Sequence, residues 1–238
     1  SQRFEAKLTK SPLEIYKKLR ITNPSPFMYF INFNDFQIIG SSPEILVRLR
    51  KNKITIRPIA GTRPRGLSAK KDAFYKQELL NDKKELSEHL MLLDLGRNDV
   101  GKVSKINSVK VTEKFKVEKY SHVMHIVSNV EGKFNKKHSL LDTMLAGFPA
   151  GTVSGAPKIR AMEIIDELEK SKRKMYAGAI GYFSANQNFD TCIALRTALI
   201  KNNKFYIQSG AGIVADSIPE KEYLETVNKA KALINSLN

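Results

Sequence analysis

The residues of this chain whose types and spacing are best suited to chemistry are two pairs of glutamates, Glu85 with Glu88 and Glu222 with Glu225. Residues three positions apart on a helix lie on the same face, so each pair presents two carboxylates together. Carboxylate oxygens are the ligands that hard divalent cations prefer. The small-residue run 147–158 would expose backbone N–H groups to an anion where it leads into a helix. Together these features predict a site where a metal ion holds a carboxylated substrate.

Each glutamate pair also has a simpler interpretation. Asp82 can cap a helix or mark a break in one, and Glu85 follows it at the spacing of a helix-start motif. Glu225 and Lys229 have the spacing of an ordinary helical ion pair, worth about 0.3–0.5 kcal/mol. Each pair, however, has a nearby run rich in small residues and fixed polar groups. These runs, residues 94–99 and 209–212, favour a ligand-binding site over the simpler interpretation.

The pattern of apolar residues indicates the elements that must position these side chains. Two apolar/polar alternations around residues 50–53 are typical of a hairpin. The helical patterns cover residues 11–20, 69–95, 157–170 and 218–237, and the strand-like runs cover residues 44–49, 54–59, 116–132, 176–184 and 192–213. Hairpins combined with long helices predict an α+β fold with largely antiparallel sheets. No linker divides the chain, so we expect one domain.

The last helix carries the most detailed prediction. Ser217 and Glu220 have the spacing of a capping box, with Pro219 just inside the helix. The helical period predicts a core stripe of Tyr223, Val227, Ala230, Ile234 and Leu237, and a separate stripe of Glu222, Glu225 and Lys229.

Composition excludes several classes of protein. The single cysteine, Cys192, leaves no intrachain disulfide and no cluster of thiolate ligands, which fits a reducing compartment. No stretch reads as a signal peptide or as a span of about 18 apolar residues, so we expect a cytoplasmic protein without membrane partners. The chain begins at Ser1 without an initiator methionine, and we expect it to be a fragment.

The formal charge of +16 comes from 40 lysines and arginines against 24 acidic residues. Such a charge is typical of nucleic-acid binding, and a non-catalytic nucleic-acid-binding or regulatory module remains the alternative from a different class. The lysines are scattered, however, and no RNA-binding, zinc-finger or basic-arm pattern accompanies them. We therefore expect no nucleic-acid partner, and a positive field that draws in a small dianion.

Six segments resemble the chorismate-utilising enzymes in order and spacing across nearly the whole chain. They are residues 41–44 (SSPE), 58–66 (PIAGTRPRG), 85–99, 122–125 (HVMH), 147–158 and 208–229. Within that family the chain most resembles the catalytic domain of anthranilate synthase component I. The resemblance implies a four-layer α/β/β/α fold with two sheets packed face to face, and one chorismate-binding catalytic domain over residues 1–238. An N-terminal subdomain and a first strand would then be missing from this chain.

The resemblance also implies a reaction. Ammonia adds at C2 of chorismate as the ring hydroxyl leaves, and the aminated intermediate then eliminates pyruvate to give anthranilate. Ammonia would come from a glutamine amidotransferase subunit, anthranilate synthase component II. Three relatives stay open as alternatives: aminodeoxychorismate synthase component I, isochorismate synthase and salicylate synthase. The first typically carries a nucleophilic lysine where this chain has Ala60, which has no nucleophile.

The family's functional positions map onto this sequence one by one. Glu44 would be the general acid, His125 would handle protons in the elimination, and Thr152 would lie at the ring. Without the resemblance, Glu44 reads as an exposed carboxylate at a strand end, and His125 as a structural histidine. Mg²⁺ would be bound by Glu85, Glu88, Glu222 and Glu225. The substrate would be bound by Thr62, Tyr176, Arg196, Gly210, Ala211, Gly212 and Lys229.

The segment 23–30 resembles one wall of the tryptophan pocket in feedback-inhibited members, with Pro26 and Met28 at matching positions. It also reads simply as a turn leading into a buried strand. The opposite wall belongs to the N-terminal subdomain, so we expect weak or no tryptophan binding by this chain.

Overall fold

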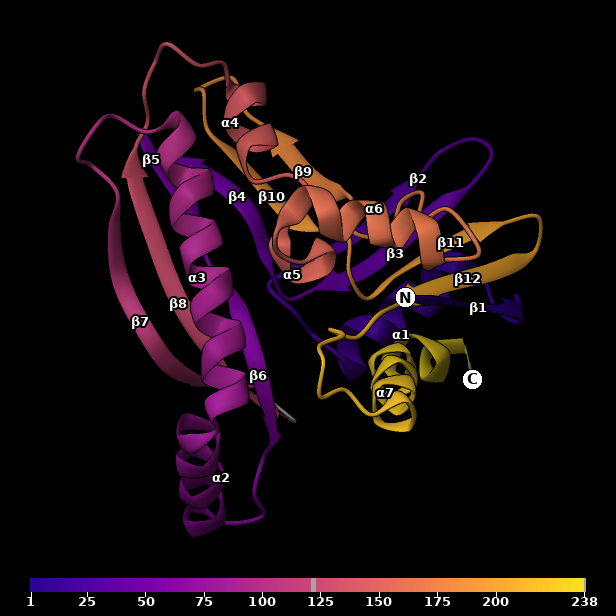
Figure 1. Ribbon diagram of the computed structural model, residues 1–238. Coiled ribbons are helices and arrows are strands. Elements are labelled where there is room, and N and C mark those ends of the chain that lie inside the picture. Colours follow the sequence, from indigo (N-terminus) through magenta and orange to yellow (C-terminus); the bar gives the residue numbers. More distant parts are fainter. Residues whose placement is uncertain (121–122, 238) are drawn as a thin grey trace. The chain divides into compact units, whose positions relative to one another are not determined.

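The computed structural model of the chain describes residues 1–120 and 123–237 (Figure 1). The chain divides into two compact units. The first unit comprises Ser1–Glu44, Ile159–Ile180 and Cys192–Asn238, and the second comprises Ile45–Lys158 and Gly181–Thr191. His122, which belongs to one of the six family segments, lies outside the described residues.

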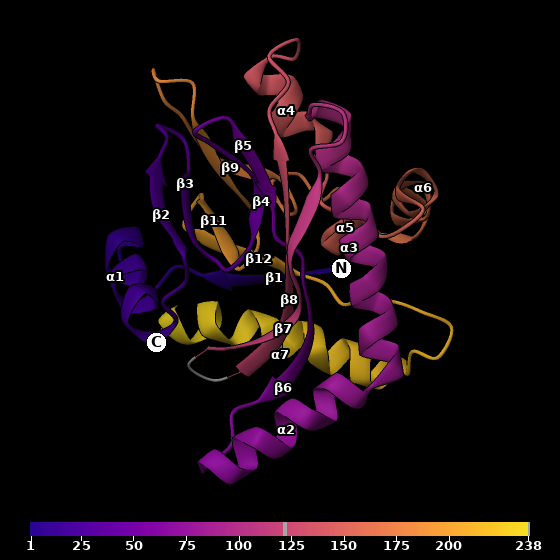
Figure 2. The ribbon, with the colours of Figure 1, turned by 90° about the vertical axis from the view of Figure 1, so that its left-hand side faces the viewer.

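The first unit is built on a five-stranded sheet. Its strands run in the order β1 (Gln2–Lys7), β12 (Lys204–Ser209), β11 (Thr197–Lys201), β3 (Gln37–Ser42) and β2 (Phe27–Asn32), and every neighbouring pair is antiparallel. Helix α1 (Pro12–Thr22) packs against β3, and helix α7 (Pro219–Leu237) packs against β12 and α1 (Figure 2). Helix α6 (Lys158–Leu168) has no buried residue. The core between the sheet and the two helices contains Ile15, Leu19, Ile39, Phe205 and Leu233.

Helix α7 differs in two respects from its sequence pattern. It begins at Pro219, so Ile218 takes the N-cap position, and the hydroxyl of Ser217 instead accepts a hydrogen bond from the Val214 N–H (3.0 Å). The predicted core stripe is wrong at Tyr223, which is 57% exposed. The buried positions are Thr226, Ala230, Leu233, Ser236 and Leu237. Thr226 can be buried because its hydroxyl donates to the Tyr223 carbonyl (2.7 Å).

The second unit is built on a sheet in the order β6 (Ile59–Pro64), β8 (Val123–Lys133), β5 (Lys53–Ile56), β4 (Ile45–Arg50), β10 (Phe189–Ile193) and β9 (Ala179–Phe183), with β7 (Lys110–Lys119) paired to β8. The pairs that β8 forms with β5, β6 and β7 are antiparallel. The predicted hairpin is confirmed as β4–β5, where Lys51 and Asn52 take positive φ angles of 50° and 60°. Such angles suit the tight turns that join twisted antiparallel strands.

Four helices belong to the second unit: α2 (Ala69–Asn81), α3 (Lys83–Val103), α4 (Leu140–Ala146) and α5 (Gly151–Ser154). The single helix expected over residues 69–95 is therefore two helices. Asp82 both separates them and caps the second, because its Oδ1 accepts the N–H groups of Lys84 and Glu85 at 3.0 and 3.2 Å. Helix α3 packs along β6 and β8 (Figure 1). Leu79 of α2 packs with Met124 and Ile126 of β8 in a buried cluster.

Gly40 on β3 lies opposite Tyr29 on β2. A Cβ atom at position 40 would lie 2.2 Å from Cε2 of the tyrosine ring, and the Tyr29 hydroxyl is held by Thr197 Oγ1 at 2.5 Å. We expect Gly40→Ala to lower the free energy of unfolding by about 1–3 kcal/mol, because the added methyl group overpacks this contact. Urea titration measures the change.

The matched control is Gly101→Ala on α3, where an added Cβ meets nothing within 4 Å. Removing a glycine from a helix should raise the free energy of unfolding by about 0.5–1 kcal/mol. Equal urea midpoints for Gly40→Ala and the unmodified protein would show that the Tyr29 ring moves aside freely.

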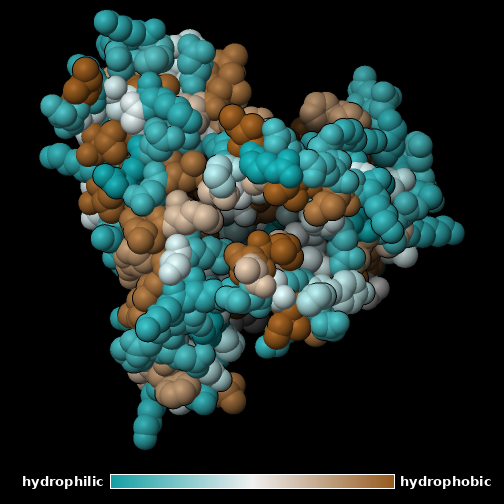
Figure 3. Space-filling view, in the orientation of Figure 1, coloured by the Kyte–Doolittle hydropathy of each residue, from teal (hydrophilic) through white to brown (hydrophobic). Residues whose placement is uncertain are grey.

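Within residues 1–120 and 123–237, no helix combines the length and the apolar character needed to cross a bilayer. Hydrophilic residues spread over the face displayed in Figure 3, with hydrophobic residues between them. The expected cytoplasmic location stays a prediction.

Candidate active site

A glycine bulge in the second unit brings several predicted site residues together. Gly61 has a φ of +69°, and the pairing of β6 with β8 shifts register between Ala60 and Thr62. Side chains other than glycine rarely adopt this angle, and a Cβ here would lie 3.2 Å from Oε2 of Glu85. The bulge therefore lets the Glu85 carboxylate approach the main chain of β6.

His125 lies on the other side of the same bulge. It pairs with Thr62 across the strands, and its Nδ1 is 2.9 Å from the Gly61 carbonyl and 3.1 Å from Thr62 Oγ1. A carbonyl only accepts hydrogen bonds, so Nδ1 carries the proton, and Nε2 is the nitrogen that can gain or lose one. The ring of Tyr120 meets the imidazole edge-on at 5.4 Å. This arrangement fits proton handling by His125, which stays a prediction.

Glu85 and Glu88 form the acidic part of this cluster. Burial raises the pKa of Glu85, and the charge of Glu88 raises that pKa further, while Arg63 opposes both. Two like charges on a half-buried helix face are relieved when a cation binds between them. Carboxylate oxygens are also the donors that magnesium prefers, so the pair fits a magnesium ion.

Arg63 is a residue to which sequence analysis gave no role. Its guanidinium lies 2.7 Å from Glu78 Oε1, 2.7 Å from Asp82 Oδ2 and 3.3 Å from Glu85 Oε1. In the sequence, the only sign of a role for Arg63 was its place in the segment PIAGTRPRG. Its three carboxylate partners lie on α2, at the break between the helices and on α3, so no local pattern connects them with Arg63. Arg63 thus connects β6 to the start of α3 at Glu85.

The first unit brings together four other predicted residues. Nζ of Lys229 donates to the Gly210 carbonyl (3.0 Å) and pairs with Glu225 Oε1 (2.6 Å). A Cβ on Gly210 would lie 3.0 Å from the Tyr176 hydroxyl. Burial raises the pKa of Tyr176 to about 12, so this hydroxyl remains a hydrogen-bond donor at neutral pH. An ammonium and a phenol beside a glycine main chain suit a carboxylate ligand.

Glu44 is only 6% exposed, and its carbonyl accepts the Ile193 N–H at 3.1 Å. The alternative interpretation of Glu44 as an exposed carboxylate is therefore wrong. Arg196 lies between β10 and β11 with a φ of 47°, and its carbonyl accepts the Ser41 N–H at 3.1 Å. The remaining first-unit residues are Glu222, half-buried on α7, and Ala211 and Gly212 in the loop before it.

Thr152 lies on the short helix α5, and its hydroxyl oxygen is buried without a hydrogen-bond partner in the described part of the chain. Buried hydroxyls usually have a partner, so this one suits a ligand atom. Lys158 reaches Asp99 on α3 at 3.1 Å and ties the end of the run 147–158 to that helix. Of the two tryptophan-pocket candidates, Pro26 is exposed and Met28 packs against the first unit's core.

The four glutamates predicted to bind magnesium belong to different units, Glu85 and Glu88 to the second and Glu222 and Glu225 to the first. Outside positions 121, 122 and 238, which are not described, no three His, Cys, Asp or Glu side chains are grouped as a metal site. The shared four-carboxylate site therefore stays a prediction.

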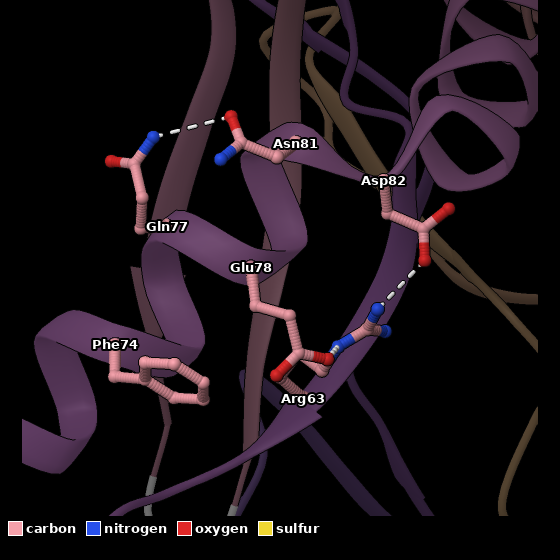
Figure 4. A pocket seen from close by; sticks show the side chains of 6 residues that line it. All are labelled: Arg63, Phe74, Gln77, Glu78, Asn81 and Asp82. Atoms are coloured by element: carbon pink, nitrogen blue, oxygen red, sulfur yellow. Dashed lines mark hydrogen bonds and ion pairs between the residues drawn. The ribbon is translucent and has the colours of Figure 1, made fainter.

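An open pocket of 440 Å³ lies on the second unit, lined by Arg63, Phe74, Gln77, Glu78, Asn81 and Asp82 (Figure 4). None of these side chains is a predicted site residue. We therefore do not identify this pocket with the candidate active site. Figure 4 shows that the Arg63 side chain reaches from β6 between Glu78 and Asp82.

The burial of His89, next to Glu88, should make the stability of the protein depend on pH. It is fully buried, its Nε2 bonds Ser128 Oγ at 2.7 Å, and burial lowers its pKa to about 4. Between pH 6.5 and 4 the unfolded chain binds a proton that the folded chain does not, so stability falls as the pH falls. We expect a loss of about 3 kcal/mol across that window from this residue alone.

The measurement is the free energy of unfolding at pH 7 and pH 4 for the unmodified protein and for His89→Gln. The variant should lose less stability than the unmodified protein over this interval, because glutamine does not titrate. Equal losses would mean that the folded protein protonates His89 normally.

The chain belongs to the family of chorismate binding enzymes, whose family model matches residues 1–235. Among its relatives it is 62% identical over 98% of its length to anthranilate synthase component 1 of Cereibacter sphaeroides. It is 56% identical over its whole length to the enzyme of the same name from Pseudomonas aeruginosa. The chain spans about half the length of these relatives, 47% and 48%. The sequence-based resemblance to anthranilate synthase component I is thereby confirmed.

Comparison with solved structures supports the same family assignment. Anthranilate synthase component I from Streptococcus pneumoniae matches 98% of this chain and 51% of its own, with a TM-score of 0.91 and 50% identity. The menaquinone-specific isochorismate synthase of Escherichia coli matches 99% of this chain and 56% of its own, with a TM-score of 0.87 and 26% identity. The predicted α+β fold of the chorismate-binding enzymes is confirmed.

Proposed function

We propose that this chain is the catalytic part of an anthranilate synthase component I, which converts chorismate to anthranilate. The single observation that carries the proposal is the 62% identity with a relative of that name over 98% of the chain. The isochorismate synthase from Escherichia coli, by contrast, is 26% identical. The local geometry at Gly61 and at Gly210 supports the proposal, because each provides groups that the reaction needs.

The reaction requires a proton for a poor leaving group. In the first half, ammonia bonds to C2, the ring double bonds shift, and the ring hydroxyl departs as water. Buried Glu44 would donate the proton to that hydroxyl. In the second half, the bond to the enolpyruvyl oxygen breaks, and His125 would take the C2 proton through its Nε2 as pyruvate leaves.

Substrate carboxylates would be held by charged and neutral hydrogen-bond donors. Arg196, Tyr176, Lys229 and the main chain at residues 210–212 would bind the enolpyruvyl carboxylate, with Thr62 and Thr152 near the ring. Mg²⁺, when bound by Glu85, Glu88, Glu222 and Glu225, would neutralise the ring carboxylate. The proposal takes residues 1–238 as one chorismate-binding catalytic domain.

The partners follow from the same assignment. Ammonia would come from a glutamine amidotransferase subunit, anthranilate synthase component II, and the protein would work in the cytoplasm. Pro26 and Met28 would contribute one wall of a tryptophan site.

Aminodeoxychorismate synthase component I is the second candidate. The residue that argues against it is Ala60, which is 8% exposed on β6 and provides no amine to attack the ring. That enzyme releases no pyruvate, so the two reactions are distinguished by their products.

The test is incubation of the protein with chorismate, Mg²⁺ and ammonium salt at alkaline pH. We expect the blue fluorescence of an ortho-amino acid and one pyruvate for each chorismate consumed. An aminated product without pyruvate would favour the second candidate. DNA retention that falls steeply with salt, without any loss of chorismate, would favour a nucleic-acid-binding module.

A further inference from the structure

Arg63 makes three ion pairs and one main-chain contact. Besides Glu78, Asp82 and Glu85, its Nη1 donates to the Thr62 carbonyl at 3.0 Å. The Arg63 side chain is 17% exposed, whereas its three carboxylate partners are 44%, 31% and 25% exposed, in the order Glu78, Asp82 and Glu85. We call Arg63, Glu78, Asp82 and Glu85 the Arg63 cluster.

The cluster fixes the place where α3 begins. Asp82 uses one oxygen for Arg63 and the other to cap the N–H groups of Lys84 and Glu85. The Arg63 guanidinium thereby connects the first turn of α3, which carries Glu85, to β6. The planar guanidinium fork holds several oxygens at fixed angles, which an ammonium cannot do.

The two oxygens of the Glu85 carboxylate have different neighbours in the structure. Oε1 lies 3.3 Å from Arg63 Nη1, and Oε2 lies on the side of Gly61, 3.2 Å from where its Cβ would be. One arginine shared among three carboxylates leaves the cluster with net negative charge. The Glu85 carboxylate is therefore oriented by Arg63 but not neutralised by it, and it can still attract a cation.

We propose that Arg63 is a positioning residue for the metal site: it holds Oε1 of Glu85 through the Arg63 cluster, so that Oε2 is presented to a divalent cation. The inference rests on the proposed function, since it takes Glu85 as a metal-binding residue. Groups that orient metal ligands typically change metal affinity by 10- to 100-fold when they are removed. The exposed pocket beside Glu78 and Asp82 leaves the outer side of the cluster open to solvent (Figure 4).

The test is direct binding of Mn²⁺ to the 238-residue chain, measured by the electron paramagnetic resonance signal of free Mn²⁺. We expect Arg63→Met to weaken Mn²⁺ binding about tenfold or more. Arg63→Lys keeps the charge but cannot hold three carboxylates, so it should weaken binding by a smaller factor. If Arg63→Met fails to fold, Arg63→Lys decides, and unchanged affinity in that variant overturns the proposal.

The matched control is Arg65→Met, two residues further along the chain and just after β6 ends at Pro64. Arg65 also holds a carboxylate, the buried Asp72, and it donates to the Tyr120 carbonyl (2.6 Å), but it makes no ion pair with Glu85. We expect this variant to lose stability and keep its Mn²⁺ affinity. Equal weakening by Arg65→Met and Arg63→Met would show a general structural effect and overturn the positioning role.

The variant Glu85→Gln distinguishes a failure of the role proposed for Arg63 from a failure of the metal assignment of Glu85. If Glu85→Gln loses Mn²⁺ and Arg63→Met retains it at full affinity, the role of Arg63 is wrong and the metal assignment stands. If Glu85→Gln binds Mn²⁺ as the unmodified protein does, the metal assignment and the role of Arg63 both fall.

Discussion

Replacing Glu88 with glutamine should reduce magnesium-dependent anthranilate formation by about a thousandfold or more while the protein stays folded. The substitution removes a negative charge from the proposed metal ligands, and a bound cation contributes several kcal/mol to such a reaction. Stability should not suffer, because the change relieves the repulsion that raises the pKa of Glu85. The measurement is anthranilate fluorescence over a range of Mg²⁺ concentrations, with unfolding followed in parallel.

The control for Glu88→Gln is Glu163→Gln on α6. Glu163 is 54% exposed and pairs with Arg160, so the same chemical change occurs at a residue with no proposed role in the chemistry. We expect this variant to turn over chorismate normally. Turnover by Glu88→Gln within a factor of three of the unmodified protein would remove Glu88 from the metal site.

Glu44→Gln should lower the rate of chorismate consumption by about 100- to 10,000-fold, the range over which general acids contribute. Glutamine has the shape of the glutamic acid but cannot transfer a proton to the departing hydroxyl. Because Glu44 is 6% exposed, an isosteric replacement leaves no cavity, and the free energy of unfolding should stay close to that of the unmodified protein. Rates measured with saturating chorismate isolate the chemical step.

Binding of chorismate distinguishes a catalytic role of Glu44 from a structural one. Calorimetry should show that Glu44→Gln binds chorismate with nearly the affinity of the unmodified protein, since the proton is needed only as the hydroxyl leaves. A variant that loses binding and turnover by the same factor would instead assign Glu44 to holding the substrate.

Local sequence patterns predicted several elements well. The hairpin between β4 and β5 turns at Lys51 and Asn52, and the polar run between two alternating stretches was enough to place it. Helix α1 begins after Ser11, within two residues of the expected boundaries. In both cases the deciding interactions lie within a few residues of one another, so the sequence contains them directly.

Helix α7 shows where the periodic pattern stops being informative. Two neighbouring rows of residues on this helix are both compatible with burial, one through Tyr223 and one through Thr226. The second row is buried, and the hydroxyl of Ser209 on β12 donates to the Thr226 carbonyl at 2.7 Å. Which row faces the sheet depends on residues far away in the chain, and a hydrophobic period does not contain that information.

The sequence by itself determined the α+β class, the family and the residue types needed for a carboxylated substrate and a cation. Tertiary structure decided that Glu44 is buried, that Asp82 divides one apparent helix into two, and that Arg63 joins β6 to Glu85. The physical reason is the separation along the chain of the residues that interact. Turns and helix starts are fixed by neighbours along the chain, whereas burial and ion pairing depend on which distant segments the fold brings into contact.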